Sequence, residues 1–197
     1  MFGIPGSAAA DSGVKEECND DEGGDAMTEL VPRVRAVLAT TTSHWLLLAE
    51  TLSPEALHRP PAPGEWSAMG CLGHLRDAER DVFHVRVRAF LAGQDLLPYD
   101  PDTQESAKAE ETPMELAKDF AGLRAESLAL LAQVQAADVE REVHHGEYGP
   151  VRLGELLHHW AAHDLMHTVQ AEQALMQPFI AGSGPWRPTF AAHDVEE

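Results

Sequence analysis

Four long segments with helix-like spacing of apolar residues constrain the fold of this chain more than any other feature. In the first segment, apolar side chains recur at steps of three, four or a multiple of these, at Leu30, Val34, Val37, Trp45, Leu48 and Leu52. This spacing lines one face of a helix. The same pattern predicts helices over about residues 28–52, 68–92, 113–136 and 152–176.

The segments between these helices carry recognisable start and stop signals. Ser67 is a good N-cap for the second helix, and Gly93 suits a left-handed helix end. Thr112 and Glu115 form a capping box around Pro113, whose missing N–H costs nothing at the first helical position. Residues 140–151 contain two glycines and a proline, which predicts a turn or a short hairpin.

The sequence therefore predicts an all-α four-helix bundle whose connections differ in length. Residues 94–111 are polar and contain two prolines, so we expect a long crossover between the second and third helices. Such a crossover is typical of bundles that are not simple up-and-down arrangements. After Pro178 we expect irregular chain, in which Trp186 folds back onto the bundle as an aromatic anchor.

Charge separates an N-terminal tail from the globular part. Residues 1–26 hold seven acidic residues and one lysine, with little sustained hydrophobicity, so we predict a disordered acidic tail. The bundle then covers residues 27–188, and 189–197 form a C-terminal tail. The whole chain has a formal charge of -19, which repels phosphate backbones, so we expect no nucleic-acid partner.

The expected location is the cytoplasm. The first residues lack a basic start followed by an apolar run, and no stretch approaches the roughly 18 apolar residues that span a bilayer, so we expect no membrane partner. The two cysteines, Cys18 and Cys71, cannot make a disulfide scaffold, which fits a reducing compartment.

Histidines on the fourth helix suggest a metal site. His159, His163 and His167 follow one another at intervals of four, so they lie on one helical face with Cβ atoms roughly 5–6 Å apart. Two such imidazoles can share one ion, but a further ligand must come from elsewhere. His74 on the second helix is the candidate, since its flanks are apolar. The alternative is that these histidines only cover a solvated or partly buried face.

The chain resembles the DinB/YfiT-like superfamily of metal-binding four-helix bundles over roughly residues 28–188. The matching pieces are Glu65-Trp66-Ser67, Gly73-His74-Leu75, Asp77-Ala78-Glu79, Gly149, His163-Asp164, His167, Gln170 and Gly184-Pro185-Trp186. The resemblance implies that His74, His163 and His167 bind one divalent metal ion. It does not require the neighbouring His158 and His159, which are then surface histidines or lie behind the ligands.

Three nitrogen ligands leave a coordination position for water or substrate, which favours chemistry over a purely structural ion. Such an ion can lower the pKa of bound water towards roughly 7, bind a thiolate or polarise a carbonyl. Zinc or nickel is expected first, although copper and iron also suit three imidazoles. The resemblance implies transferases that use low-molecular-weight thiols, or metal-dependent hydrolases, and we place thiol transfer slightly ahead.

Two other functions remain open, as does the oligomeric state. The ion could be structural in a stress-linked interaction protein, where metal loss lowers stability without abolishing a reaction. A plain bundle with incidental histidines is the last alternative. A homodimer is compatible with any of the three.

Several further residues are candidates near the ligands. A ligating imidazole usually donates its other N–H to an oxygen, so carboxylates or amides are expected nearby. The candidates are Asp77, Glu79, Asp81, Asp164 and Gln170, and for each carboxylate a solvated surface position is the alternative. Cys71 is read as a small buried apolar residue, with ligand or nucleophile as the alternative. Trp66, Trp160 and Trp186 are candidate cavity walls or core residues.

Overall fold

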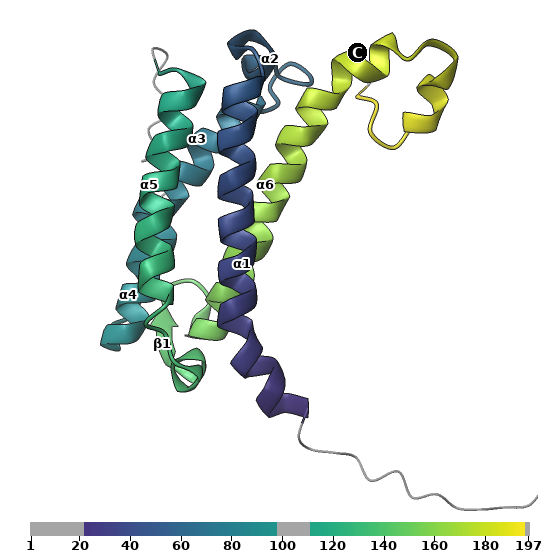
Figure 1. Cartoon of the computed structure of the whole chain (residues 1–197). Helices are drawn as coiled ribbons and strands as arrows, with labels where there is room; N and C mark the ends of the chain where they lie inside the picture. Colours follow the sequence, from purple (N-terminus) through teal and green to yellow (C-terminus); the bar gives the residue numbers. More distant parts are fainter. Residues whose placement is uncertain (1–21, 98–110, 196–197) are drawn as a thin grey trace, which may run out of the picture.

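Four long helical rods form the fold of the computed structural model, which describes residues 22–97 and 111–195 (Figure 1). The rods are α1 (Glu22–Thr51), α3 (Ala68–Ala78) continued into α4 (His84–Ala92), α5 (Pro113–Leu131) and α6 (Leu153–Gly182). A π-helical turn, η1 (Glu79–Phe83), joins α3 to α4. The predicted all-α four-helix bundle is confirmed.

The helices pack as a closed ring. α1 packs against α5 and α6, and α3 packs against the same two helices from the other side. α4 ends near the hairpin end of the bundle, whereas α5 begins at the opposite end (Figure 1). The chain between them therefore connects opposite ends, as the predicted crossover requires, although residues 98–110 of that crossover lie outside the described part.

The predicted caps are present. Ser67 Oγ accepts a hydrogen bond from the Gly70 N–H, and Thr112 with Glu115 forms the complete capping box. Gly93 has φ +65° at the end of α4, in the left-handed region where a side chain would be strained. Sequence signals for helix ends were therefore reliable where a cap residue carried them.

Several predicted helix boundaries were wrong. α1 begins at Glu22, six residues before the predicted start, and residues 1–21 of the predicted tail lie outside the described part. A short helix, α2 (Pro54–His58), occupies part of the predicted loop after Ser53. α5 ends at Leu131, before the predicted 136, and is followed by the 3-10 turn η3 (Ala136–Glu140).

The C-terminal part of the bundle also differs from prediction. α6 continues through Pro178 to Gly182, and Ile180, two residues after the proline, is buried. The following 3-10 helix, η4 (Gly184–Phe190), leaves Trp186 71% exposed, so the predicted aromatic anchor is wrong. Glycine and proline flank this tryptophan and set a turn that carries the ring into solvent.

A hairpin connects η3 to α6 and confirms the prediction for residues 140–151. Strand β1 (Glu142–His145) pairs antiparallel with β2 (Gly149–Arg152), with Val143 opposite Val151. Gly149 has φ +76°, which favours glycine at this turn position. Leu96, just after α4, bridges to His145 and ties the hairpin to the end of α4.

Two apolar clusters fill the bundle interior. One lies towards the hairpin and includes Phe83, Phe90 and Trp160, and the other includes Trp45, Leu72 and Phe120. Burial of this much apolar surface is the main stabilising contribution to such a bundle. No helix within the described residues has both the length and the apolar character to cross a membrane.

Candidate metal centre

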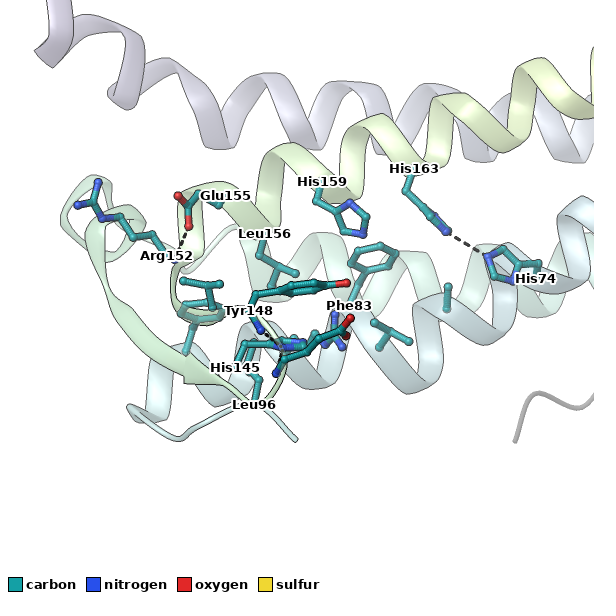
Figure 2. A pocket seen from close by; sticks show the side chains of 16 residues that line it. His74, Phe83, Leu96, His145, Tyr148, Arg152, Glu155, Leu156, His159 and His163 are labelled. Carbon is teal, nitrogen blue, oxygen red and sulfur yellow. Dashed lines mark hydrogen bonds between the residues drawn. The ribbon is translucent and has the colours of Figure 1, made fainter. Parts of the chain in front are cut away.

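The structure brings the three predicted histidines together. His74 projects from α3, whereas His163 and His167 project from successive turns of α6. One potential ligand atom from each residue lies within 4.8 Å of the other two. His74 Nε2 and His163 Nε2 are 3.1 Å apart and point at one another (Figure 2). We call His74, His163 and His167 the histidine triad.

The spacing of the triad suits a small divalent cation. Zinc–nitrogen distances of about 2.0–2.1 Å in a tetrahedral site place two nitrogens roughly 3.3 Å apart. The 3.1 Å between the two Nε2 atoms is close to that edge length. In the metal-free chain one ring must donate a proton to the other for this hydrogen bond, and a bound cation would take the place of that proton.

Gln170 fixes the orientation of His167. His167 Nδ1 lies 2.9 Å from Gln170 Oε1, one turn further along α6. An amide oxygen only accepts hydrogen bonds, so His167 Nδ1 donates and Nε2 keeps the lone pair that a metal needs. The sequence named Gln170 as a candidate near the ligands, and the structure shows its contact with His167. Trp66 stacks on the His167 ring at 5.6 Å between centroids, with an interplanar angle of 20°.

The two histidines of the triad on α6 favour the neutral form that binds metals. Burial, followed by the neighbouring His167 and His74 rings, lowers the pKa of His163 to about 3. Burial also lowers the pKa of His167, although its bond to Gln170 acts in the opposite direction. Neutral imidazoles keep lone pairs at physiological pH, so no proton has to leave His163 before a cation can bind.

A buried ion cluster lies on the core side of the triad. The Arg124 guanidinium from α5 donates to both carboxylate oxygens of Asp164, at 2.6 and 3.2 Å. Its Nε lies 3.0 Å from Glu79 Oε1 in the π-helical turn, and it also donates to the carbonyl of Leu38 on α1. Thr41 Oγ1 donates to Asp164 as well. The cluster therefore contacts all four rods of the bundle.

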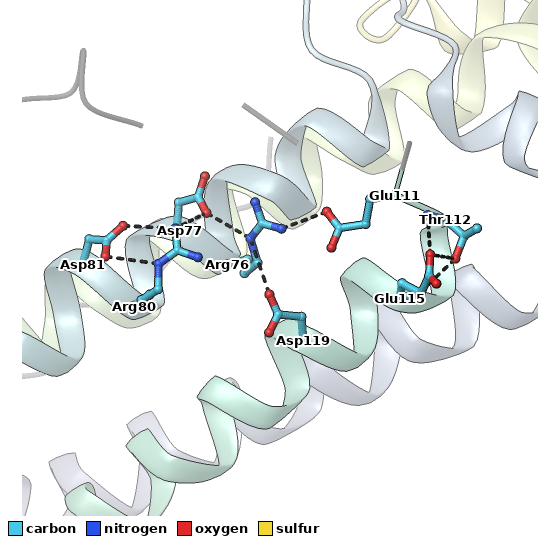
Figure 3. A network of polar contacts seen from close by, with 8 residues as sticks. All are labelled: Arg76, Asp77, Arg80, Asp81, Glu111, Thr112, Glu115 and Asp119. Atoms are coloured by element: carbon cyan, nitrogen blue, oxygen red, sulfur yellow. Dashed lines mark hydrogen bonds and ion pairs between the residues drawn. The ribbon is translucent and has the colours of Figure 1, made fainter. Parts of the chain in front are cut away.

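The carboxylates that were predicted to lie near the ligands pair with arginines instead. Asp77, Glu79 and Asp164 are buried, so the solvated alternative is wrong for them. Figure 3 shows Asp77 between Arg76 and Arg80, at 2.9 Å from each, and Asp81 beside Arg80 at 3.2 Å. Arginines one to three residues away in the sequence therefore pair with these two carboxylates.

Arg76 links this network to the start of α5. It lies 2.8 Å from Glu111 and 3.9 Å from Asp119, so the network joins α3 to α5 (Figure 3). These ion pairs therefore help to hold α3 against α5.

Cys71 behaves as the buried apolar residue that the sequence favoured. It is fully buried within the cluster around Trp45 and Phe120. Burial raises the pKa of its thiol to about 11, so it stays protonated at neutral pH. A buried thiol in this form is neither a metal ligand nor a nucleophile.

A cavity of about 600 Å³ opens beside the triad. It begins at His74 and His163 and continues between α4 and α6 towards the hairpin. Phe83 and Leu156 form part of its apolar wall, and Tyr148 extends along it from the hairpin turn (Figure 2). The volume falls in the range typical of small-molecule sites, roughly 300–1,000 Å³.

Sequence reasoning missed the lining of this cavity beyond the triad. Arg86, His145, Tyr148 and His159 all border it, and the sequence had assigned only His159 any position, on the surface or behind the ligands. The hairpin is brought to α4 by the Leu96–His145 bridge, which no local pattern announces. Trp160 stacks on Phe83 at 5.0 Å with an angle of 4° and is a core residue beneath the cavity.

The fold and the site define a class: a four-helix bundle with a three-histidine cluster at one end of a small-molecule cavity. A model of the DinB superfamily matches residues 25–171, and the chain belongs to that family. This confirms the family resemblance seen in the sequence. No curated protein matches the chain.

A solved structure supports the fold assignment. The chain is similar to YfiT from Bacillus subtilis, which is described as "a probable metal-dependent hydrolase with an unusual four-helix bundle topology". The TM-score is 0.58 at 18% sequence identity, and the match covers 82% of this chain and 90% of YfiT. At this identity the likeness establishes the shared fold.

Proposed function

We propose that the histidine triad binds one divalent metal ion and that the chain is a metal-dependent enzyme acting on a small molecule. The observation that carries the proposal is the convergence of three imidazoles from two helices beside a cavity of about 600 Å³. A purely structural ion would more often be closed off by four protein ligands. Here His74 and His163 border the cavity directly, so a substrate could approach the ion from that side.

A bound divalent ion with an open position supplies Lewis-acid chemistry, either by activating water or a thiol or by polarising a carbonyl. Zinc and nickel are the ions that we favour, since three imidazoles suit both. The described activity of YfiT favours hydrolysis for this chain. Transfer of a low-molecular-weight thiol remains the second candidate, because a family-level resemblance implies it.

The surrounding residues position the triad and control its protonation. Gln170 holds the Nδ1 proton of His167, so the ring presents Nε2. The Arg124 and Asp164 pair fixes the rotation of α6 from the core side. Phe83 contacts the His163 ring edge-on, at 5.2 Å between centroids, and gives it an apolar neighbour.

The first test is elemental analysis of the full-length chain expressed without a histidine tag. Wild type is compared with a His163→Ala/His167→Ala variant, and with a His158→Ala/His193→Ala variant that removes two exposed histidines outside the triad. About one ion per chain in wild type and control, and none in the triad variant, would support the proposal. Equal metal in all three, or none in any after growth in metal-supplemented medium, would overturn it.

A second measurement separates catalysis from a structural ion. Metal-loaded and chelator-treated protein are compared for thermal unfolding, for ester hydrolysis and for conjugation of a thiol to an alkyl halide. Turnover that disappears with the metal and returns on its addition supports an enzyme. A large loss of thermal stability with no turnover in either state would favour the interaction protein with a structural ion.

A further inference from the structure

The end of the cavity far from the triad contains an unused hydrogen-bond donor. His145 lines this end and is 96% buried, since only 4% of the residue is exposed. Its Nδ1 accepts hydrogen bonds from the backbone N–H groups of Glu147 and Tyr148, at 3.1 and 3.4 Å. The neutral ring therefore carries its proton on Nε2. This buried Nε2 has no hydrogen-bond partner within the described part of the chain.

A buried donor without a partner is costly, and native structures rarely leave one. The Nε2–H of His145 cannot serve as a metal ligand while it keeps its proton, and Nδ1 is already occupied. What the ring lacks is an acceptor, such as an oxygen atom. A ligand that supplies an oxygen at this end of the cavity would satisfy it.

Arg86 adds a positive charge to the same end. It lines the cavity, and its charge contributes, after burial, to lowering the pKa of both His145 and His159. The guanidinium therefore lies close enough to influence both rings. A guanidinium and an imidazole N–H together match a carboxylate, which offers two acceptor oxygens and one negative charge.

The remaining charges at this end select against a more highly charged anion. Glu155 accepts from the backbone N–H of Arg152 in the cap of α6, and Glu147 borders the cavity near His145. Arg152 also borders the cavity, but it is exposed and its guanidinium lies 3.7 Å from Glu140. With two acidic side chains nearby, a phosphate dianion would be repelled more strongly than a single carboxylate.

Apolar walls separate the two polar ends of the cavity. Val82 lies between His74 and Arg86 along the rod of α3 and α4, Leu156 lies on α6 between the hairpin and His163, and both line the cavity. Arg86 follows His74 by twelve residues, which corresponds to roughly 18 Å along the helical rod. The long side chain of Arg86 can span part of this distance. The cavity thus suits an elongated molecule with an apolar middle. Tyr148 stacks on His145 at 4.7 Å and flanks the polar end.

We infer that Arg86 and His145 form a carboxylate-binding subsite that orients the substrate of the triad. The inferred substrate class is a small monocarboxylate with an apolar body whose opposite end reaches the ion. Arg86 and His145 bind the carboxylate, and the apolar wall accepts the body of the molecule. The binding of a carboxylate by Arg86 and His145 does not depend on the proposed function. The inference rests on the proposed function only where it makes the bound molecule the substrate of the triad.

The test uses the full-length chain after chelation, so that no metal can bind a carboxylate, with octanoate and the neutral octanamide as probes in calorimetric titrations. Wild type is compared with Arg86→Met and His145→Asn. Asparagine keeps an acceptor near the place of Nδ1 but removes the Nε2–H donor. Arg152→Met is the control for loss of a positive charge at the cavity mouth.

Octanoate should bind wild type at least roughly tenfold more tightly than octanamide, since hydrogen bonds to charged groups are worth that much. Arg86→Met and His145→Asn should each lose about tenfold for octanoate and change octanamide less than about threefold. Arg152→Met should stay within about twofold of wild type. In histidine-labelled wild type, octanoate should also shift the His145 Nε2–H resonance, which a loss of folding in one variant could not mimic.

Equal affinities for octanoate and octanamide would overturn the subsite, as would a loss in Arg152→Met as large as in Arg86→Met. Failure of both probes to bind would overturn it as well. The two proposals fail separately. A chain that binds octanoate selectively but retains no ion keeps the subsite and loses the metal centre. A chain that holds its ion but does not discriminate the probes keeps the centre and loses the subsite.

Discussion

His163 and Asp164 are consecutive on α6 but face opposite environments. His163 Nε2 lies 3.1 Å from His74 Nε2 beside the cavity, whereas Asp164 is fully buried and binds Arg124 through both carboxylate oxygens. Successive side chains on a helix are about 100° apart, so one rotation of α6 serves both contacts. The core ion pair and the triad therefore depend on the same orientation of α6.

Asp164→Ala should destabilise the bundle strongly. The substitution leaves the Arg124 guanidinium buried with fewer acceptors, and breaking a buried pair costs about 3–5 kcal/mol. Urea unfolding followed by circular dichroism measures the change. Glu55→Ala, at the exposed pair with Arg59, is the control and should change stability little. Equal midpoints for wild type and Asp164→Ala would contradict this assignment.

Gln170→Ala should weaken metal binding without removing a ligand. Losing the acceptor of the His167 Nδ1 proton frees the ring to rotate, and loss of such a partner typically costs about 10–100-fold in metal affinity. Competition with a chromophoric chelator reports the affinity. Gln173→Ala, on the same helix, should match wild type. Equal losses in both variants would point to a general effect on α6 instead.

The unfolding free energy of the Glu79→Gln variant relative to wild type should increase as pH rises. Burial raises the pKa of Glu79 more than Arg124 lowers it, so the folded chain holds this proton more tightly than the unfolded chain does. The stability linked to that proton is present below the ordinary glutamate pKa of about 4.3 and is lost as pH rises through the folded-state pKa.

Glutamine cannot ionise, so the variant escapes that loss. The unfolding free energy of Glu79→Gln minus that of wild type should therefore increase from about pH 4.3 upward and level off above the raised pKa. Urea unfolding at several pH values between 4 and 8 gives this difference. A difference independent of pH, or one that falls, would show that the pKa of Glu79 is not raised.

Gly154→Ala should destabilise the start of α6, whereas Gly122→Ala should not. A Cβ at Gly154 would lie 2.8 Å from Val139 Cγ1 and 3.3 Å from the Val139 carbonyl oxygen. Overpacking of this kind costs about 1–3 kcal/mol. At Gly122, on the exposed side of α5, a Cβ meets nothing within 4 Å. Alanine there should add up to about 1 kcal/mol, from helix propensity.

Thermal unfolding of wild type, Gly154→Ala and Gly122→Ala measures these changes in stability. The melting temperatures should move in opposite directions. A rise for both would mean that Val139 and the η3 turn can shift away from α6 at little cost.

Local patterns predicted the helices, their caps and the hairpin because these depend on residues close in sequence. Ser67, Gly93 and the Thr112 capping box all lie where the sequence placed them. The end of α6 was not predictable in this way. Pro178 reads as a helix stop, but the helix continues past it, and Ile180 in the added turn is buried.

The same distinction holds for the candidate site: local spacing predicted some of its features, and the packing of the helices determined the others. The spacing of His163 and His167 on one helix, with His74 brought in by family resemblance, was enough to nominate the triad, and its convergence is seen in the structure. The sequence did not specify which histidine Gln170 contacts, the ion cluster of Arg124 with Asp164 and Glu79, or the lining of the cavity. Each of these depends on which helix faces which, or on a side-chain rotation that spacing leaves free.

By itself, the sequence determined that this chain makes four amphipathic helices and carries three histidines able to meet. Those properties follow from periodicity and from the residue types that caps and ligands require. Only the tertiary structure decided that His145 and Arg86 share a cavity with the triad, because the hairpin and α4 meet through a contact 49 residues apart in sequence, between Leu96 and His145. Contacts of that separation depend on how the whole bundle packs, and no local pattern encodes them.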